Sequence, residues 1–381
     1  MHSKIPGFLK FLSLPIAATL IFHSTGFAAF DWNGVRIEPY ADLSESYDDN
    51  ITFRKNDPID DFITSLALGL GAKYETGLTR LDITGILRYD FFADHDEFNN
   101  LSGDVTADWR QELSKYDRLR LKDNYYHSDE ARNFTDAFNK AAGRFSYQRN
   151  RFSADYEHDF NSQWGAVARY ENDVTVYSAD GFNDSMMNSV GGDVVYNVDS
   201  STKLLAGYDF KIREFDHGGN ATVHGVSGGL RRYFTKQVYF DGRAGVDFID
   251  AYDGRNLTEP NVSAKLTDDL NETTRVDVAF ELEHSLNAYT EDIFDHWQVS
   301  SSFKKEWTRR LDTLFSVFYG DGDYVSTDRH DEFFGANVAL NYELVKDWRA
   351  MIKYNFTNVD SSLDSEEYQR NVVLLGIARH F

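Results

Sequence analysis

One short motif in this 381-residue chain carries the spacing of a hydrolytic nucleophile. Gly225-Val226-Ser227-Gly228-Gly229 matches the G-x-S-x-G pattern, which needs a strand-to-helix turn and an acid and a His later in the chain. Apolar and polar residues alternate around this stretch, which predicts that the motif lies inside a strand. Small residues in a strand let neighbouring backbones approach closely. We therefore interpret the motif as structural.

Two histidines have acidic neighbours that could orient an imidazole for acid–base catalysis. His95 lies between Asp94 and Asp96, and His330 precedes Asp331. The chain has 62 acidic residues, so neighbours of this kind also arise from composition alone. We expect a protein that is not an enzyme and needs no cofactor.

The segment 320–332 is rich in carboxylates, which are the ligands that Ca²⁺ prefers. The metal-ligand candidates are Asp321, Asp323, Asp328 and Glu332. Val325 and Ser326 occupy the positions where an EF-hand needs a ligand and a glycine. The alternative is therefore a solvated anionic loop, which cations that bridge lipopolysaccharide phosphates would also reach.

Composition excludes several classes of protein. The net charge is −23, from 39 basic and 62 acidic residues, and nucleic-acid-binding proteins instead carry basic patches. The chain has no Cys, so it has no disulfide, no Cys-ligated zinc and no thiol nucleophile. Aromatic residues make up 15% of the chain, unlike a disordered composition.

The first 29 residues have the pattern of a secretory signal. Lys4 and Lys10 provide the positive start, residues 11–22 are mostly apolar, and Gly26 and Ala28 suit a cleavage site. After residue 30 no apolar stretch approaches the roughly 18–20 residues of a membrane helix. We expect residues 30–381 to form a single domain outside the cytoplasm.

The elements that would position all these side chains are strands with one apolar and one polar face. The alternation is clearest in 62–75, 81–91, 101–113, 164–177, 203–213, 238–249, 273–286, 334–344 and 348–357. Segments of this length match tilted membrane strands rather than globular strands of about 5–6 residues. The pattern predicts an all-β, antiparallel outer-membrane β-barrel.

Connections between the segments alternate between short turns and nine long polar loops. Nine loops predict 18 strands, with 16 as the alternative, and no plug domain. The long loops hold 30 acidic and 6 basic residues, which predicts an anionic extracellular rim. The loop at 128–142 is the best candidate for a constriction inside the lumen.

The polar faces of the predicted strands carry both signs of charge. A barrel of 16–18 strands is too wide for side chains to fill, so these faces predict the wall of a water-filled lumen. The candidate pore-wall residues are Arg80, Arg88, Arg110, Arg120, Arg169, Arg213, Arg243, Asp90, Asp108 and Glu281.

Aromatic residues mark the predicted membrane borders and the end of the chain. Trp109, Trp164, Trp307 and Trp348 lie near predicted short turns, as in the aromatic girdle of a membrane barrel. The last segment alternates and ends at Phe381. That ending resembles the signal read by the barrel-insertion machinery, although Arg379 departs from it.

Four short motifs are similar to those of the outer-membrane β-barrel porin families of proteobacteria. They are Tyr47-Asp48-Asp49-Asn50-Ile51, Asp60-Asp61-Phe62-Ile63-Thr64, Arg149-Asn150-Arg151 and Tyr368-Gln369-Arg370-Asn371. The resemblance covers the chain after residue 30 and implies a barrel in the bacterial outer membrane. Some members of these families are associated with exopolysaccharide production and export.

Pattern and resemblance together predict a porin-like channel for passive passage of hydrophilic solutes, saccharides among them. The alternatives are an exit duct for an exopolysaccharide and a non-conducting barrel whose loops bind partners at the surface. The expected partners are outer-membrane lipid, lipopolysaccharide, the insertion machinery and a saccharide, and no nucleic acid.

Overall fold

The structure is a computed structural model, and it describes residues 29–128, 145–178, 182–288, 290–327 and 329–380. Nineteen strands and one short 3-10 helix make up its regular elements within these ranges. No helix in them is long and apolar enough to cross a membrane. Residues 1–28 of the predicted signal, residues 129–142 of the predicted constriction loop, Asp328 and Phe381 lie outside the described residues.

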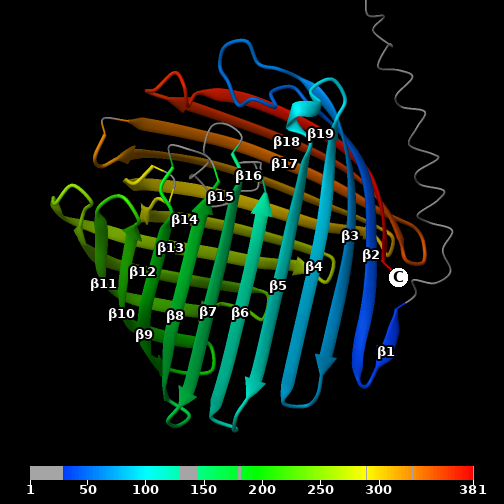
Figure 1. The fold of residues 1–381 in the computed structure, drawn as a ribbon. Coiled ribbons are helices and arrows are strands. Elements are labelled where there is room, and N and C mark those ends of the chain that lie inside the picture. The colour runs from blue at the N-terminus through cyan, green and yellow to red at the C-terminus, as the bar shows by residue number, and fades with distance from the viewer. Residues whose placement is uncertain (1–28, 129–144, 179–181, 289, 328, 381) are drawn as a thin grey trace, which may run out of the picture.

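The strands run antiparallel, each beside its neighbours in the sequence (Figure 1). The first ten are β1 (Phe30–Trp32), β2 (Val35–Asp48), β3 (Asp61–Glu75), β4 (Thr79–Phe92), β5 (Asn100–Glu112), β6 (Asp117–Ser128), β7 (Tyr147–Asp159), β8 (Trp164–Tyr177), β9 (Ser185–Asn197) and β10 (Thr202–Phe215), with helix η2 (Asp96–Phe98) between β4 and β5. The others are β11 (Asn220–Tyr233), β12 (Val238–Asp250), β13 (Asn256–Asn271), β14 (Thr274–Leu286), β15 (Ile293–Thr308), β16 (Leu311–Tyr324), β17 (His330–Val345), β18 (Trp348–Ser361) and β19 (Tyr368–His380).

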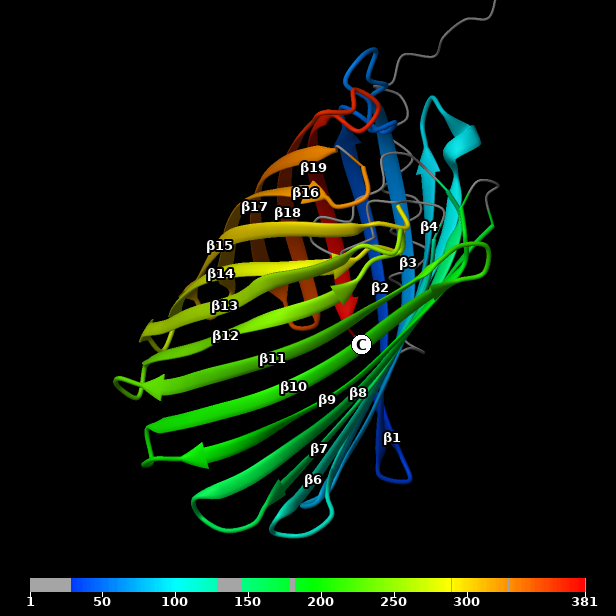
Figure 2. The same cartoon turned by 90° about the vertical axis from the view of Figure 1, so that its left-hand side faces the viewer.

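The last strand closes the sheet on itself. β19 pairs with β2 from Val372↔Asp48 to His380↔Tyr40, so β2–β19 form a closed barrel of 18 strands. The prediction of 18 strands is confirmed, and the alternative of 16 is wrong. The short β1 pairs with the start of β2, on the edge that β19 leaves uncovered. Figure 2 shows the strongly tilted strands of the resulting cylinder.

Several strands extend further into the predicted long loops than the alternation indicated. The loop predicted at 320–332 is reduced to residues 325–329, because β16 continues to Tyr324 and β17 begins at His330. The ladder between these two strands stays regular up to Asp323↔His330. The alternation did not indicate this extension, because the ends of the two strands are rich in acidic residues, as loops are.

The dry core of the molecule lies inside the barrel, at the end where the long loops emerge. One buried cluster joins Phe53 of the β2–β3 loop to inward-facing residues of β15–β19 (Phe294, Tyr324, Phe333, Val359 and Tyr368). Three further clusters occupy the same level under other loops. At this end of the barrel the inner face of the strands is therefore apolar, and the long loops pack on it.

Candidate functional site in the barrel lumen

The ten predicted pore-wall residues lie on one face of the sheet. In the ladder, Arg110 stands opposite both Arg80 and Arg120, and side chains of paired residues share a face. Asp108 accepts hydrogen bonds from Arg110 Nη2 at 3.1 Å and from Arg120 Nη2 at 2.6 Å. Two of the ten, Asp90 and Arg213, are 1% and 2% exposed. These two hold the wall together and offer almost no surface to a solute.

The opposite face carries an exposed apolar belt with aromatic borders. Leu87, Val190, Val226, Ile352 and Leu375 are all about half exposed or more, as lipid contact would require. Rings pair at one border in Trp164–Tyr196 and at the other in Trp297–Tyr319. A closed sheet with such a belt can satisfy its backbone inside a bilayer. The chain is an outer-membrane β-barrel.

The inner faces of β7–β14 of this barrel form a hollow of about 540 Å³, called here the acidic hollow. Its lining contains six acidic residues (Asp155, Glu171, Asp209, Asp247, Glu281 and Glu283) against three basic ones (Arg169, Lys211 and Arg243). Arg243 Nη2 binds Asp193 Oδ2 at 2.7 Å, and Arg169 Nη2 binds Asp209 Oδ1 at 3.0 Å. Because these arginines are already paired, the surface of this hollow is negative.

A second hollow of about 530 Å³, called here the basic hollow, lies between β2–β6 and β17–β19. Its lining has three basic residues (Arg88, Lys353 and Arg370) and one acidic residue, Asp104. It crosses the line where β19 closes on β2. The lumen of the barrel therefore presents opposite signs of charge on two sides, each formed by eight strands.

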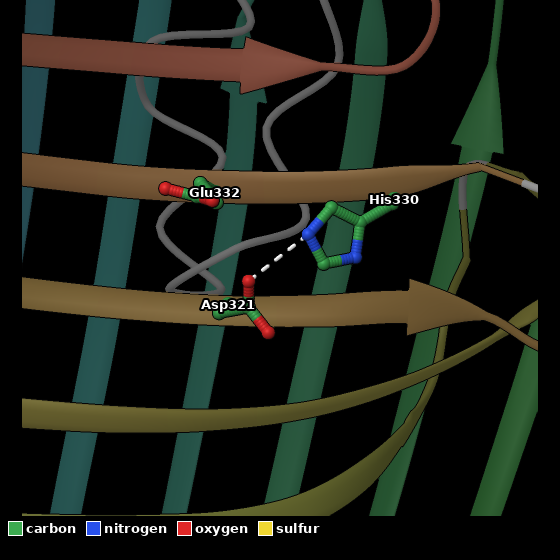
Figure 3. Close-up of side chains that lie close together, drawn as sticks. All are labelled: Asp321, His330 and Glu332. Atoms are coloured by element: carbon green, nitrogen blue, oxygen red, sulfur yellow. Dashed lines mark ion pairs between the residues drawn. The ribbon is translucent and has the colours of Figure 1, made fainter.

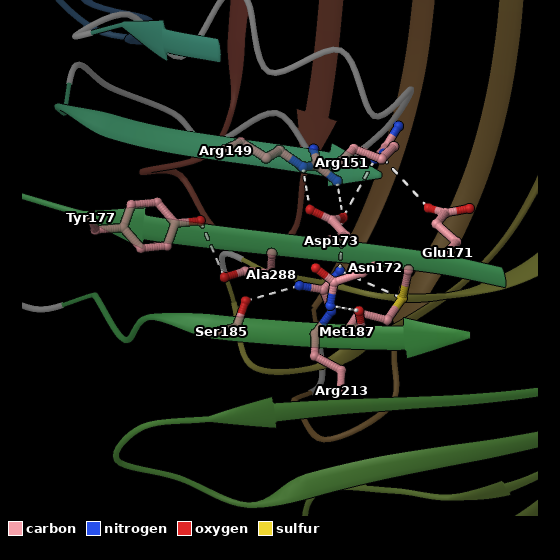
Figure 4. Close-up of polar contacts among 10 residues, drawn as sticks. All are labelled: Arg149, Arg151, Glu171, Asn172, Asp173, Tyr177, Ser185, Met187, Arg213 and Ala288. Atoms are coloured by element: carbon pink, nitrogen blue, oxygen red, sulfur yellow. Dashed lines mark hydrogen bonds and ion pairs between the residues drawn. The ribbon is translucent and has the colours of Figure 1, made fainter. Parts of the chain in front are cut away.

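A buried ionic cluster fixes the wall above the acidic hollow (Figure 4). Asp173 of β8 is fully buried and binds Arg149 Nη2 at 2.5 Å and Arg213 Nη2 at 3.3 Å. Arg213 also donates to Ser185 Oγ at 2.9 Å. Burying charges is costly unless they are paired and hydrogen-bonded, and here three neighbouring strands supply the partners. Sequence reasoning placed Arg213 in the lumen but not in such a cluster.

The described residues of the β14–β15 loop (287, 288 and 290–292) contact strands and loops far from β14 and β15 in the sequence. Tyr177 of β8 donates a hydrogen bond to the carbonyl of Ala288 at 3.2 Å, and Asn183 Nδ2 donates to Glu291 Oε1. Asp292 is 2% exposed and accepts the backbone N–H of Ser326 at 2.8 Å. The described residues of this loop are thus attached to β8, to Asn183 and to the β16–β17 connection. The constriction predicted at 128–142 stays a prediction, because residues 129–142 lie outside the described part of the chain. Nothing in the alternation pointed to the contacts of the β14–β15 loop.

Of the predicted metal ligands, Asp321 and Glu332 lie on the outer face, just beyond the aromatic border (Figure 3), as does Asp323, whereas Asp328 lies outside the described residues. One ligand atom each from Asp321, His330 and Glu332 lies within 4.8 Å of the other two. His330 Nε2 is 3.0 Å from Asp321 Oδ2, and its Nδ1 is 2.8 Å from Asp323 Oδ1. Both imidazole nitrogens therefore face carboxylates, an arrangement that also suits a simple ion-pair network. The metal site stays a prediction.

The catalytic candidates are not assembled into a triad. His330 binds Asp321 and Asp323, whereas the expected partner Asp331 binds Arg329 Nη2 at 2.6 Å. Ser227 lies within β11, as the structural interpretation requires. His224, three residues before Ser227, has its Nδ1 2.7 Å from the hydroxyl of Tyr208. Near the rim, His95 Nδ1 contacts Glu97 Oε1 at 3.1 Å rather than Asp94 or Asp96.

Comparison with known proteins finds similarity only in shape. No family model and no curated protein matches the sequence. Among solved structures, OccAB4 from Acinetobacter baumannii has a TM-score of 0.49 and 12% identity, over 94% of this chain and 100% of that one. OpdK of Pseudomonas aeruginosa, solved with vanillate, has 0.49 and 9%, over 91% and 98%. The siderophore receptor PirA of Pseudomonas aeruginosa has 0.49 and 7%, over 91% and 80%. Likeness at this level assigns no solute.

Proposed function

We propose that this barrel is a porin-like channel for the passive passage of hydrophilic solutes across the outer membrane. The observation that carries the proposal is the pair of polar hollows, of about 530 and 540 Å³, on two sides of the lumen. Side chains cannot fill a barrel of this strand number. Charged and hydroxyl-bearing walls would admit water and polar solutes and disfavour apolar ones.

Saccharides are the solute class to test first. Hydroxyl and amide side chains such as Ser102, Asn337, Asn355 and Thr357 line the basic hollow, and these groups both donate and accept hydrogen bonds. An exit duct for an exopolysaccharide would use the same chemistry in the other direction.

A second candidate is a non-conducting barrel that binds partners with its loops. The specific observation in its favour is the β14–β15 loop, which is attached to β8 by the hydrogen bond from Tyr177 to Ala288. A firmly attached loop of this kind would reduce or stop conduction.

Single-channel recording in planar bilayers separates the two candidates. We expect discrete ohmic current steps from the purified barrel. Heat-dependent migration in electrophoresis verifies beforehand that the barrel is folded. Swelling of proteoliposomes in sugars of increasing size then measures the width of the path. A correctly folded barrel that gave neither current nor swelling would overturn the channel proposal. Conduction gained only after shortening residues 288–291 would identify the loop as a closed lid.

A further inference from the structure

Among the described residues, two of the three cations of the basic hollow form no ion pair. Arg88 of β4 and Lys353 of β18 are half-buried. Neither has a carboxylate within ion-pair distance in the part of the chain that the structure describes. The third cation, Arg370, is different, since its Nε lies 3.0 Å from both carboxylate oxygens of Asp48. Arg88 and Lys353 are thus the cations of this hollow that could accept a new partner.

The carboxylates around this hollow are already occupied or hidden. Asp104, the acidic residue in the lining, accepts from Asn124 Nδ2 at 2.9 Å and from Thr106 Oγ1 at 3.3 Å. Asp42 and Asp90 are 3% and 1% exposed, and Ser65 Oγ donates to Asp90. Their charge lowers the field at the wall, but their oxygens are not presented to the lumen. A solute in the hollow would meet the cations first.

Five neutral polar side chains complete the lining and also lack hydrogen-bond partners among the described residues. They are Ser46, Ser102, Asn337, Asn355 and Thr357. Their hydroxyl and amide groups can both donate and accept, which matches sugar hydroxyl groups rather than an apolar ligand. The volume of about 530 Å³ lies within the usual range of small-molecule sites.

We propose that the basic hollow is a binding subsite for polyhydroxylated carboxylic acids, the class of the uronates and aldonates. Arg88 binds the carboxylate, because a guanidinium matches its two oxygens with two parallel hydrogen bonds. The Ser, Thr and Asn side chains take the hydroxyl groups. Lys353 lies four strands away, about 19 Å along the wall, and adds a weaker attraction. The inference names a substrate class for the proposed channel and rests on that function for its biological sense.

The test is a binding measurement that does not depend on conduction. Saturation-transfer NMR on the detergent-solubilised barrel compares three probes: galacturonate, galactose and acetate. Galactose has the hydroxyl groups without the carboxylate, and acetate has the carboxylate without the hydroxyl groups. We expect galacturonate to bind at least tenfold more tightly than either probe, because a hydrogen-bonded charge pair adds about one or two orders of magnitude.

Matched variants assign that binding to the hollow. We expect Arg88→Gln to weaken galacturonate binding about tenfold or more and Lys353→Gln to weaken it less. Arg88→Lys, which keeps the charge, should restore part of the affinity. Lys211→Gln is the control, since Lys211 is an unpaired cation in the acidic hollow, and it should leave galacturonate binding unchanged.

The remaining outcomes overturn either the subsite or the channel, and each leaves the other proposal intact. Equal binding of galacturonate and acetate, or an equal loss in Lys211→Gln, would show mere attraction of anions and overturn the subsite. A barrel that conducts but does not discriminate among the three probes would also overturn it while the channel stands. A silent barrel that binds galacturonate through Arg88 would overturn the channel and leave the subsite.

Discussion

The two hollows of the lumen differ in where each keeps its counter-charges. In the acidic hollow, one arginine serves two carboxylates, since Arg169 binds both Asp193 and Asp209, and further carboxylates line the surface. In the basic hollow the carboxylates Asp42, Asp48 and Asp90 are almost fully buried, so that Arg88 and Lys353 remain at the surface. The sign of each surface therefore follows from which charges are in excess in its lining, six carboxylates against three cations in the acidic hollow and three cations against one carboxylate in the basic hollow.

This difference explains how a wall with a nearly balanced composition can produce a directed field. Opposite signs face each other across the lumen instead of alternating along it. Charges that face a narrow water-filled space bounded by protein act more strongly than charges in open water. In the proposed channel, a solute that carries both a positive and a negative group would therefore orient perpendicular to the barrel axis as it passes.

The strongest way to break the comparison is to remove a buried counter-charge. Asp173→Asn leaves Arg149 and Arg213 without their shared carboxylate, and both arginines have little contact with water. We expect a loss of about 3–5 kcal/mol of unfolding free energy. Urea unfolding of the barrel in lipid vesicles, followed by Trp fluorescence, measures it.

The matched control for that loss is Asp277→Asn. Asp277 also binds two cations, Arg275 and Lys265, but those side chains are 43% and 49% exposed. Its removal should cost about 1 kcal/mol or less. Equal losses in the two variants would show that burial of the counter-charge does not distinguish these regions.

The second way to test the comparison is to neutralise the surface of one hollow. The double variant Asp247→Asn/Glu281→Gln removes two charges from the lining of the acidic hollow. Each charge interacts with a passing ion by about 0.8 kcal/mol at roughly 5 Å in water. We therefore expect the cation-to-anion permeability ratio to fall about tenfold, read from the reversal potential in a KCl gradient. Arg88→Gln/Lys353→Gln should shift the ratio in the opposite direction. A shift of the same sign in both variants would contradict a field across the lumen.

The architecture was predictable from sequence because it depends on a period of two. Every side chain that alternates, from Leu68 to Leu375, has only two directions in a strand, and a bilayer makes those directions chemically different. Counting loops then gave 18 strands, which the β19–β2 pairing confirms. The membership of the inner face followed for Arg88 or Glu281 by the same alternation.

The charge pattern of the lumen was not predictable, because it depends on contacts between distant strands. Arg370 binds Asp48 across 322 positions of the chain. Nothing in either segment indicates that this pair is buried while Arg88 forms no ion pair among the described residues. One signal was available but unused. The last inward position of several strands is aromatic or apolar, as at Phe92, Tyr177 and Phe215, and this marks the mouth where loops pack.

The mildest change acts on the β14–β15 loop, where it is attached to β8. Tyr177→Phe removes the hydroxyl that donates to the Ala288 carbonyl and keeps the ring in its aromatic cluster with Phe145 and Phe182. One hydrogen bond to a loop contributes about 0.5–1 kcal/mol. The ratio of closed to open dwell times in single-channel records should therefore fall about threefold. Tyr170→Phe is the control, because Tyr170 donates to Asn188 on the outer face and does not touch the loop. Equal effects of the two variants would mean that the 287–292 loop does not control the opening, and conduction would then depend on the two hollows alone.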